Sequence, residues 1–94
     1  MSQYKIVFCD RAVNSFRRVL ENVKSTSLIG AEEARGVILQ VIRRLASNPI
    51  QSARKAKFFS LEGEYYSVLA WNYRIYYKVE DKRVIILDVI LDKN

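Results

Sequence analysis

The sequence predicts an α+β domain in which an N-terminal strand and an antiparallel helical hairpin precede an antiparallel three-strand meander. Two observations support this prediction. Apolar residues recur at helical spacing in the first half of the chain, whereas short runs rich in β-branched and aromatic residues fill the second half. Helices and strands that are segregated along a chain are typical of α+β folds, because parallel α/β sheets alternate the two.

The first half of the chain contains one predicted strand and two predicted helices. Tyr4–Cys9 is a short apolar run that predicts a strand, and Asp10 is a candidate N-cap for the next element. Helices are expected over about Arg11 to Lys24 and about Ala31 to Ser47. Gly36 lies inside the second helix, where we expect it to allow close helix–helix contact. The apolar stripes are Val13, Phe16, Leu20 and Val23, then Ala34, Val37, Ile38, Val41, Ile42 and Leu45.

The second half of the chain predicts a connector followed by β structure. Ile50–Lys57 is a basic connector, and strands are expected at Tyr65–Trp71, Tyr73–Val79 and Arg83–Leu91, with Asp81-Lys82 at the last turn. The sheet then has three or four strands. The last strand is apolar on both faces, whereas a strand with one solvated face alternates. We therefore expect it to be central in the sheet or covered on one face by a partner.

Composition limits the class of protein. The chain has 94 residues, 50% of them apolar, with 16 basic and 10 acidic residues and a net charge of +6. We expect one domain over residues 1–94 and a polyanionic or acidic partner such as nucleic acid, the ribosome or an acidic protein segment. The single cysteine, Cys9, is consistent with a reducing cytoplasm. No signal peptide is visible, and the longest apolar run is too short to cross a bilayer.

The sequence contains no histidine. This excludes Ser-His-Asp and Cys-His catalysis, histidine metal sites and a histidine acid–base pair. Any catalysis has to use Lys, Arg, Tyr, Glu or Asp. We expect neither a metal nor a cofactor.

A resemblance to a known family rests mainly on the C-terminal half. Trp71–Asp81, which contains Tyr-Arg-Ile-Tyr-Tyr-Lys-Val, resembles the Tyr-Arg strand of RelE/ParE toxins, and Val84–Ile90 is similar to the apolar strand that follows it. Tyr4–Phe8 with Asp10–Ala12 is similar to the first strand and helix start of the family. Leu45–Pro49 resembles the end of its second helix. The resemblance covers nearly the whole chain in the same order.

The resemblance implies a RelE-like β-α-α-β-β-β fold and a cytoplasmic, growth-inhibiting toxin of a type II toxin–antitoxin module of the kind linked to plasmid stabilization. In that family a cognate antitoxin wraps over the toxin and neutralises it. Some members bind RNA in the ribosome and cut mRNA, and others poison DNA gyrase. The resemblance therefore implies ribosome-bound mRNA or gyrase as the target, without membrane or metal. The alternative is a non-catalytic basic module of this fold that binds RNA or protein.

The chain departs from the ribonucleases of the family where they carry catalytic groups. Tyr66–Leu69 has no lysine at the positions of the catalytic lysines, and Leu91 stands at the position of the terminal histidine. No tail tyrosine follows, and Glu62 and Glu64 do not match the connector glutamate of some relatives. An active chain would be an mRNA endoribonuclease, but we expect that activity to be weak or absent, which favours a gyrase-directed or inactive member.

Arg74 is the best candidate for a catalytic residue. A guanidinium stabilises negative charge on a phosphate bidentately and without proton transfer. The structural alternative is an ion pair across the last hairpin. A three-residue loop would place Arg74 opposite Asp88, and a two-residue loop would place it opposite Val89.

Further candidates come from the basic connector and from the aromatic strand that contains Arg74. Strand alternation sends Tyr73 and Tyr77 to the core with Ile75, and it places Tyr76 on the face of Arg74. The connector residues are also compatible with a solvated loop. The residues predicted to bind nucleic acid or the target are Arg54, Lys55, Lys57, Tyr76, Lys78 and Lys93.

Overall fold

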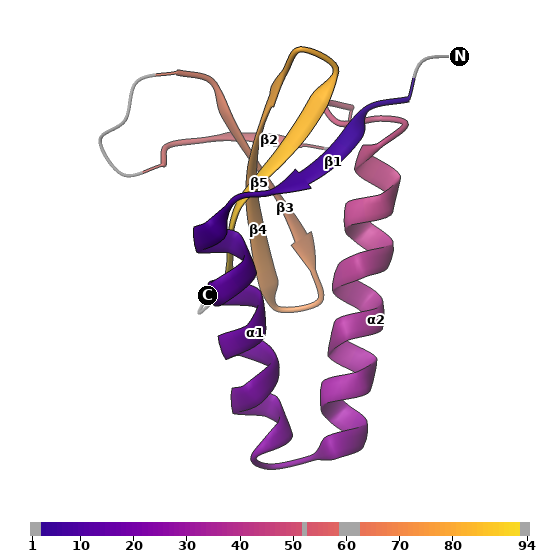
Figure 1. Ribbon diagram of the computed structural model, residues 1–94, viewed down its shortest axis with the longest axis vertical. Coiled ribbons are helices and arrows are strands. Elements are labelled where there is room, and N and C mark those ends of the chain that lie inside the picture. The colour runs from indigo at the N-terminus through magenta and orange to yellow at the C-terminus, as the bar shows by residue number, and fades with distance from the viewer. Residues whose placement is uncertain (1–2, 52, 59–62, 93–94) are drawn as a thin grey trace.

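The centre of the structure is a five-stranded sheet with the strand order β1-β5-β4-β3-β2 (Figure 1). The computed structural model describes residues 3–51, 53–58 and 63–92. The elements in chain order are β1 Lys5–Phe8, α1 Asp10–Lys24, α2 Leu28–Leu45, β2 Arg54–Ala56, β3 Tyr65–Ala70, β4 Tyr73–Glu80 and β5 Arg83–Leu91. β1 pairs with β5 in parallel, and the other neighbours are antiparallel. The predicted α+β class and element order are confirmed.

Both helices begin slightly earlier than the sequence predicts. Cys9 is the N-cap of α1, so Asp10 is its first residue, where a carboxylate is favourable near the helix N-terminus. Ser27 caps α2, and its side-chain oxygen accepts a hydrogen bond of 2.9 Å from the Gly30 N–H. This cap brings Leu28 and Ile29 into the helix, which the apolar periodicity alone did not reveal.

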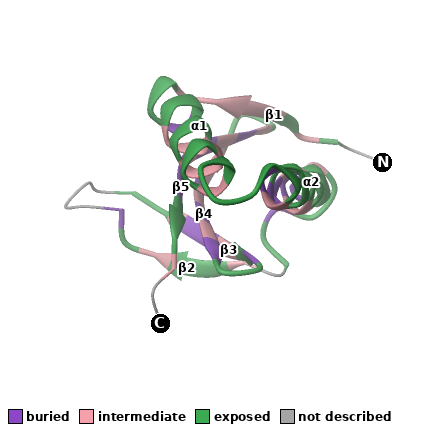
Figure 2. Ribbon diagram, turned by 90° about the horizontal axis from the view of Figure 1, so that it is seen from below, coloured by how far each residue is buried: buried purple, intermediate pink, exposed green. Residues whose placement is uncertain are grey.

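The helices cover one face of the sheet, and the core fills the space between them (Figure 2). The predicted stripe of α2 is buried or half-buried along its length, as expected. In α1, Phe16, Leu20 and Val23 of the predicted stripe pack against the core. Val13 departs from the prediction, because it is 49% exposed while Ala12 is fully buried. No helix among the described residues is long and apolar enough to span a membrane. The core includes Ala12, Ala34, Ile38, Ile42, Leu45, Tyr66, Ala70, Tyr73, Ile75, Tyr77, Val84, Ile86 and Val89.

Gly36 does not mediate helix packing, so that prediction is wrong. A Cβ atom added there would meet nothing within 4 Å, and the residue is exposed. The helix–helix side of α2 is formed by other residues, because Gly36 lies outside the stripe that contains Ala34 and Ile38.

The predicted basic connector contains a short strand. Arg54–Ala56 forms β2, which pairs with β3 at the end of the sheet, with Arg54 opposite Ser67. The sheet therefore has five strands instead of the expected three or four. A short, charged sequence gives little strand signal, but exposed edge strands are often short and rich in charge.

A bulge in the β4–β5 hairpin sets the position of Arg74. Asp81 and Lys82 form a two-residue turn with φ values of 51° and 61°, as a type I′ turn requires. The register then shifts between Tyr76 and Tyr77, so Arg74 lies opposite Ile90. Both predicted partners of Arg74 in the register are thus wrong, because an irregular ladder cannot be deduced from loop length. β5 lies between β1 and β4, which confirms the prediction of a central strand.

Candidate functional site

Arg74 lies on the face of the sheet that points away from the core. Its neighbours in β4 alternate, since Tyr73 and Ile75 are buried against the helices, as predicted for Tyr73. The guanidinium of Arg74 makes three interactions. Nε and Nη2 donate to the two carboxylate oxygens of Asp92 at 3.4 and 3.2 Å, and Nη1 donates to Ser67 Oγ at 2.9 Å. Arg74 is therefore held in a side-on, bidentate pair with a carboxylate.

A hollow of about 580 Å³ opens beside this ion pair. Arg54 joins it from β2, and its register partner Ser67 connects it to Arg74. Among the described residues no carboxylate lies within ion-pair distance of Arg54, and Asp92 is the only acidic group in the described lining. The hollow thus holds two guanidinium groups and one carboxylate. It is lined by Arg54, Ser67, Val68, Leu69, Trp71, Asn72, Arg74 and Asp92.

Trp71 stands at the rim of the hollow in an unusual backbone conformation. It occupies the β3–β4 turn with a φ of 55°, and its side chain is 59% exposed. This left-handed conformation costs about 1–2 kcal/mol for a residue other than glycine. Leu69 in β3 and Ile90 in β5 lie directly opposite Arg74 on the same face, and they are 47% and 38% exposed. The hollow therefore combines cations with exposed apolar surface.

Four other predicted site residues that the structure describes do not line the hollow, namely Lys55, Lys57, Tyr76 and Lys78. Lys55 is opposite Tyr66, so its side chain leaves β2 on the other face, and Lys57 is exposed beyond the end of β2. Lys78 shares the face of Arg74 but pairs with Glu80 at 3.6 Å. Lys93 and Glu62 lie outside the described residues.

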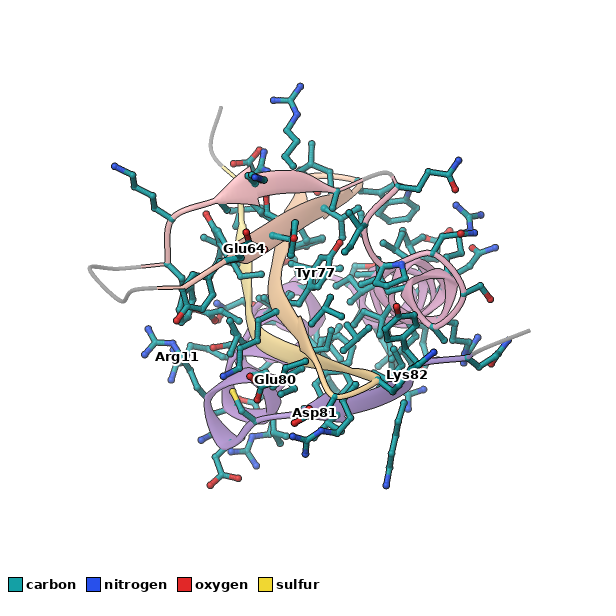
Figure 3. All side chains as sticks on the ribbon, turned by 90° about the horizontal axis from the view of Figure 1, so that it is seen from above. Arg11, Glu64, Tyr77, Glu80, Asp81 and Lys82 are labelled. Atoms are coloured by element: carbon teal, nitrogen blue, oxygen red, sulfur yellow. The ribbon has the colours of Figure 1, made fainter. Side chains whose placement is uncertain are left out.

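Tyr76 lies half-buried on the face of Arg74, as predicted, and packs there within a small aromatic cluster. The ring of Phe58 lies 5.7 Å from both the Tyr65 and the Tyr76 ring. The guanidinium of Arg11, at the outer side of the molecule in Figure 3, lies 5.8 Å from the Phe58 ring and pairs with Asp88 at 3.2 Å. Asp88, which the sequence offered as a partner of Arg74, therefore binds α1 instead.

Tyr77 is fully buried beside Tyr66 on the helix side of the sheet (Figure 3). Its hydroxyl donates to the Pro49 carbonyl at 2.5 Å. Burial, with a smaller contribution from Tyr66, raises the pKa of Tyr77 to about 12. The pKa of Tyr66 is also raised, by burial first and then by the Glu64 carboxylate, to which its hydroxyl donates. Both phenols are structural groups that stay neutral at physiological pH.

A second surface lies between the two helices. An apolar groove of about 620 Å³ runs between α1 and α2, and it exposes Val13 and Leu28. Its edges carry three basic and two acidic side chains, namely Arg17, Lys24 and Arg35 against Glu21 and Glu32. A groove of this shape and composition fits the apolar side of an amphipathic segment.

The sequence missed Ser67, Leu69 and Asp92 as members of the candidate site. In the sequence, Ser67 belongs to a predicted strand that lacks the catalytic lysines of the family, and nothing marks it as a partner of Arg74. Asp92 follows the bulge in β5, and this bulge places it near Arg74. No group of three or more potential metal ligands occurs in residues 3–51, 53–58 and 63–92.

Several solved structures share this architecture. The fold is similar to the toxin–antitoxin complex RelBE2 from Mycobacterium tuberculosis, with a TM-score of 0.69 and 19% identity over 100% of this chain and 97% of the other. It is also similar to the chromosomal ParDE system of P. aeruginosa, with a TM-score of 0.64 and 14% identity over 97% and 98% of the two chains. The YoeB dimer from Staphylococcus aureus gives 0.65 and 18%, over 98% and 100%.

These structural similarities show the fold alone, because the sequence identities are 19% or lower. The family follows from a separate comparison of the sequence. No curated protein matches the chain. Residues 6–93 match the family described as the ParE toxin of the type II toxin–antitoxin system, parDE. The match covers the sheet except for Lys5, both helices and every described residue of the hollow. The chain therefore belongs to the ParE toxin family, and it is a toxin of a type II toxin–antitoxin system.

Proposed function

We propose that this toxin stops growth by binding a protein target, DNA gyrase, and that it does not act by cutting mRNA. The proposal rests on the contacts of Arg74, whose guanidinium already donates hydrogen bonds to Asp92 and Ser67. A ribonuclease site needs a free general base or acid beside the guanidinium. The single acidic group of the described lining, Asp92, already has both oxygens bound by Arg74.

Ribosome-bound mRNA is the second candidate target. The net charge of +6 and the two arginines of the hollow favour it, because cations bind the phosphates of nucleic acid. A non-catalytic binding of RNA would use the same residues. Both targets are consistent with a cytoplasmic toxin.

Induced expression in a bacterial host, followed by two biochemical assays, separates the targets. We expect the purified chain to inhibit supercoiling by gyrase and to leave mRNA intact in a ribosome-loaded extract. Arg74→Gln should reduce the inhibition, whereas the exposed Arg43→Gln, with the same loss of charge, should not. Rapid cleavage of mRNA by the purified chain would overturn the proposal.

We also propose that a cognate antitoxin neutralises the toxin by seating an amphipathic segment in the groove between α1 and α2. The groove exposes Leu28, which is 60% exposed, so Leu28→Glu should preserve the fold but weaken binding of the antitoxin. Its neighbour Ile29 is 74% exposed and is not part of the groove lining, so Ile29→Glu is the matched control. The measurement is co-purification with the product of the adjacent reading frame. Equal loss in both variants would argue against the groove.

A further inference from the structure

The bound carboxylate of Asp92 indicates which ligand the hollow recognises. Arg74 holds it through Nε and Nη2, an arrangement that matches the planar shape of a carboxylate. Its side chain is 20% exposed and that of Arg74 is 17% exposed, so the pair is reachable from solvent. A second carboxylate that approached from outside would meet the same fork of donors.

The surroundings of the ion pair resemble a binding surface for protein. Hot spots of protein interfaces are enriched in Trp and Arg. Here the exposed Trp71 lines the hollow together with Leu69 and two arginines, of which Arg54 has no ion-pair partner among the described residues. Trp71 also keeps a left-handed backbone conformation, and such conformations cluster at ligand-binding positions.

We propose that this hollow is the docking site for an acidic segment of a partner protein, and that Asp92 acts as its internal competitor. One carboxylate of the segment replaces Asp92 on Arg74, and an aliphatic or aromatic neighbour in the segment packs on Trp71. A second carboxylate pairs with Arg54. In the free chain Asp92 occupies Arg74 and keeps the hollow closed to ligands of low affinity.

A protein segment fits the hollow better than RNA does. A nucleic acid needs several cations along its backbone. Of the cations near β4, Lys78 pairs with Glu80, and Lys55 points to the opposite face. The aliphatic side chains of Leu69 and Ile90, both exposed, complement an apolar side chain. The inference rests on the proposed function in one respect, namely that the hollow meets a protein.

The test uses the full chain and a defined probe. The probe is a capped heptapeptide with two aspartates that flank a leucine, and the matched peptide carries two asparagines instead. Trp71 is the only tryptophan of the chain, so its fluorescence reports binding at the rim of the hollow. We expect a saturable change with the acidic peptide and none with its amide counterpart. An equal response to both peptides would overturn the inference.

Variants separate competition by Asp92 from a general effect of charge. If Asp92 keeps the hollow closed nine-tenths of the time, Asp92→Asn should tighten binding of the acidic peptide about tenfold. Asp81→Asn adds the same net charge at an exposed turn, and it should change the affinity by less than about twofold, since distant surface charges are screened. Equal tightening in the two variants would reduce the effect to net charge and sink the proposal.

Two further variants test the donors and the aromatic rim. Arg74→Lys keeps the charge but removes the bidentate fork, so we expect a weaker affinity than for the matched Arg43→Lys. Trp71→Gly, followed with a labelled peptide, should weaken binding while it raises the melting temperature, because glycine accepts a φ of 55°. A loss of binding together with a lower melting temperature would assign Trp71 a structural role only.

RNA and gyrase provide the decisive comparisons. A single-stranded oligonucleotide that displaces the peptide and binds more tightly would assign the hollow to nucleic acid and overturn the proposal. Gyrase inhibition is measured separately, by supercoiling. If gyrase is inhibited but the acidic peptide does not bind, the inference fails and the proposed function stands. Peptide binding without inhibition of gyrase would retain the acidic-segment site and exclude gyrase as the target.

Discussion

Adjacent residues of β4 enter two different environments. On the helix side, Tyr73, Ile75 and Tyr77 are buried in a continuous apolar core, and the Tyr77 hydroxyl is satisfied by a backbone carbonyl. On the open side, Arg74 and Lys78 take part in ion pairs at a partly exposed surface. The helix side therefore determines whether the chain folds, whereas the open side is available for recognition.

Removal of apolar volume should affect the two sides very differently. Ile75→Ala opens a cavity in the core and should lower the free energy of unfolding by about 2–5 kcal/mol. Leu69→Ala, at an exposed position on the open side, should change it by less than about 0.5 kcal/mol. Urea unfolding measures both. Similar losses in the two variants would show that the open side is covered as well.

The pH dependence of stability should report the buried side through Tyr77. Burial raises its pKa from 10.0 to about 12, so folding favours the neutral phenol. The stabilisation is complete below pH 10 and is lost as the pH rises towards 12, by about 3 kcal/mol. Chemical denaturation between these pH values measures the loss. Tyr77→Phe should remove most of this dependence, and an unchanged slope in that variant would assign it to other groups.

Asp88 is the exception on the open side, because it is only 6% exposed. Its Oδ1 accepts from the Val89 N–H at 3.0 Å, and its Oδ2 pairs with Arg11. Asp88→Ala leaves a buried N–H without its acceptor and should cost about 1–3 kcal/mol. Asp88→Asn keeps an oxygen for that N–H and should cost less than about 1 kcal/mol, since Arg11 is half-exposed. Thermal unfolding of both variants decides whether the backbone bond or the charge matters.

A small gain in stability is expected on the outer side of α2. Gly36→Ala places a methyl group where nothing lies within 4 Å, and it should raise the free energy of unfolding by up to about 1 kcal/mol. Gly30→Ala is the contrast, because its Cβ would lie 3.2 Å from the capping Ser27 Oγ, so we expect a smaller gain or a loss. A stability loss in Gly36→Ala would indicate a packed outer surface.

Much of the fold follows from local pattern. Helical spacing identified both helices, and the alternation in β4 correctly assigned Tyr73 and Tyr77 to the core. The central position of β5 followed from its apolar residues on both faces. These features are predictable because side-chain direction repeats with a fixed period in helices and strands. β2 was not predicted, since a strand of three charged and small residues forms only through its pairing with β3.

The candidate site was predicted only in part. The sequence singled out Arg74 and Arg54, and both line the hollow. Their roles in binding remain predictions. Ser67 and Asp92 have no signal in the sequence, because a serine in a strand and an aspartate after one are common.

The sequence by itself determined the class of fold, the family resemblance and the two faces of β4. Tertiary structure decided which groups meet on the open face. The register shift between Tyr76 and Tyr77 places Ile90 opposite Arg74, brings Asp92 onto the guanidinium and turns Asp88 towards Arg11. A bulge inserts one residue and changes every pairing beyond it, and its position depends on the packing of both strands and not on local propensity.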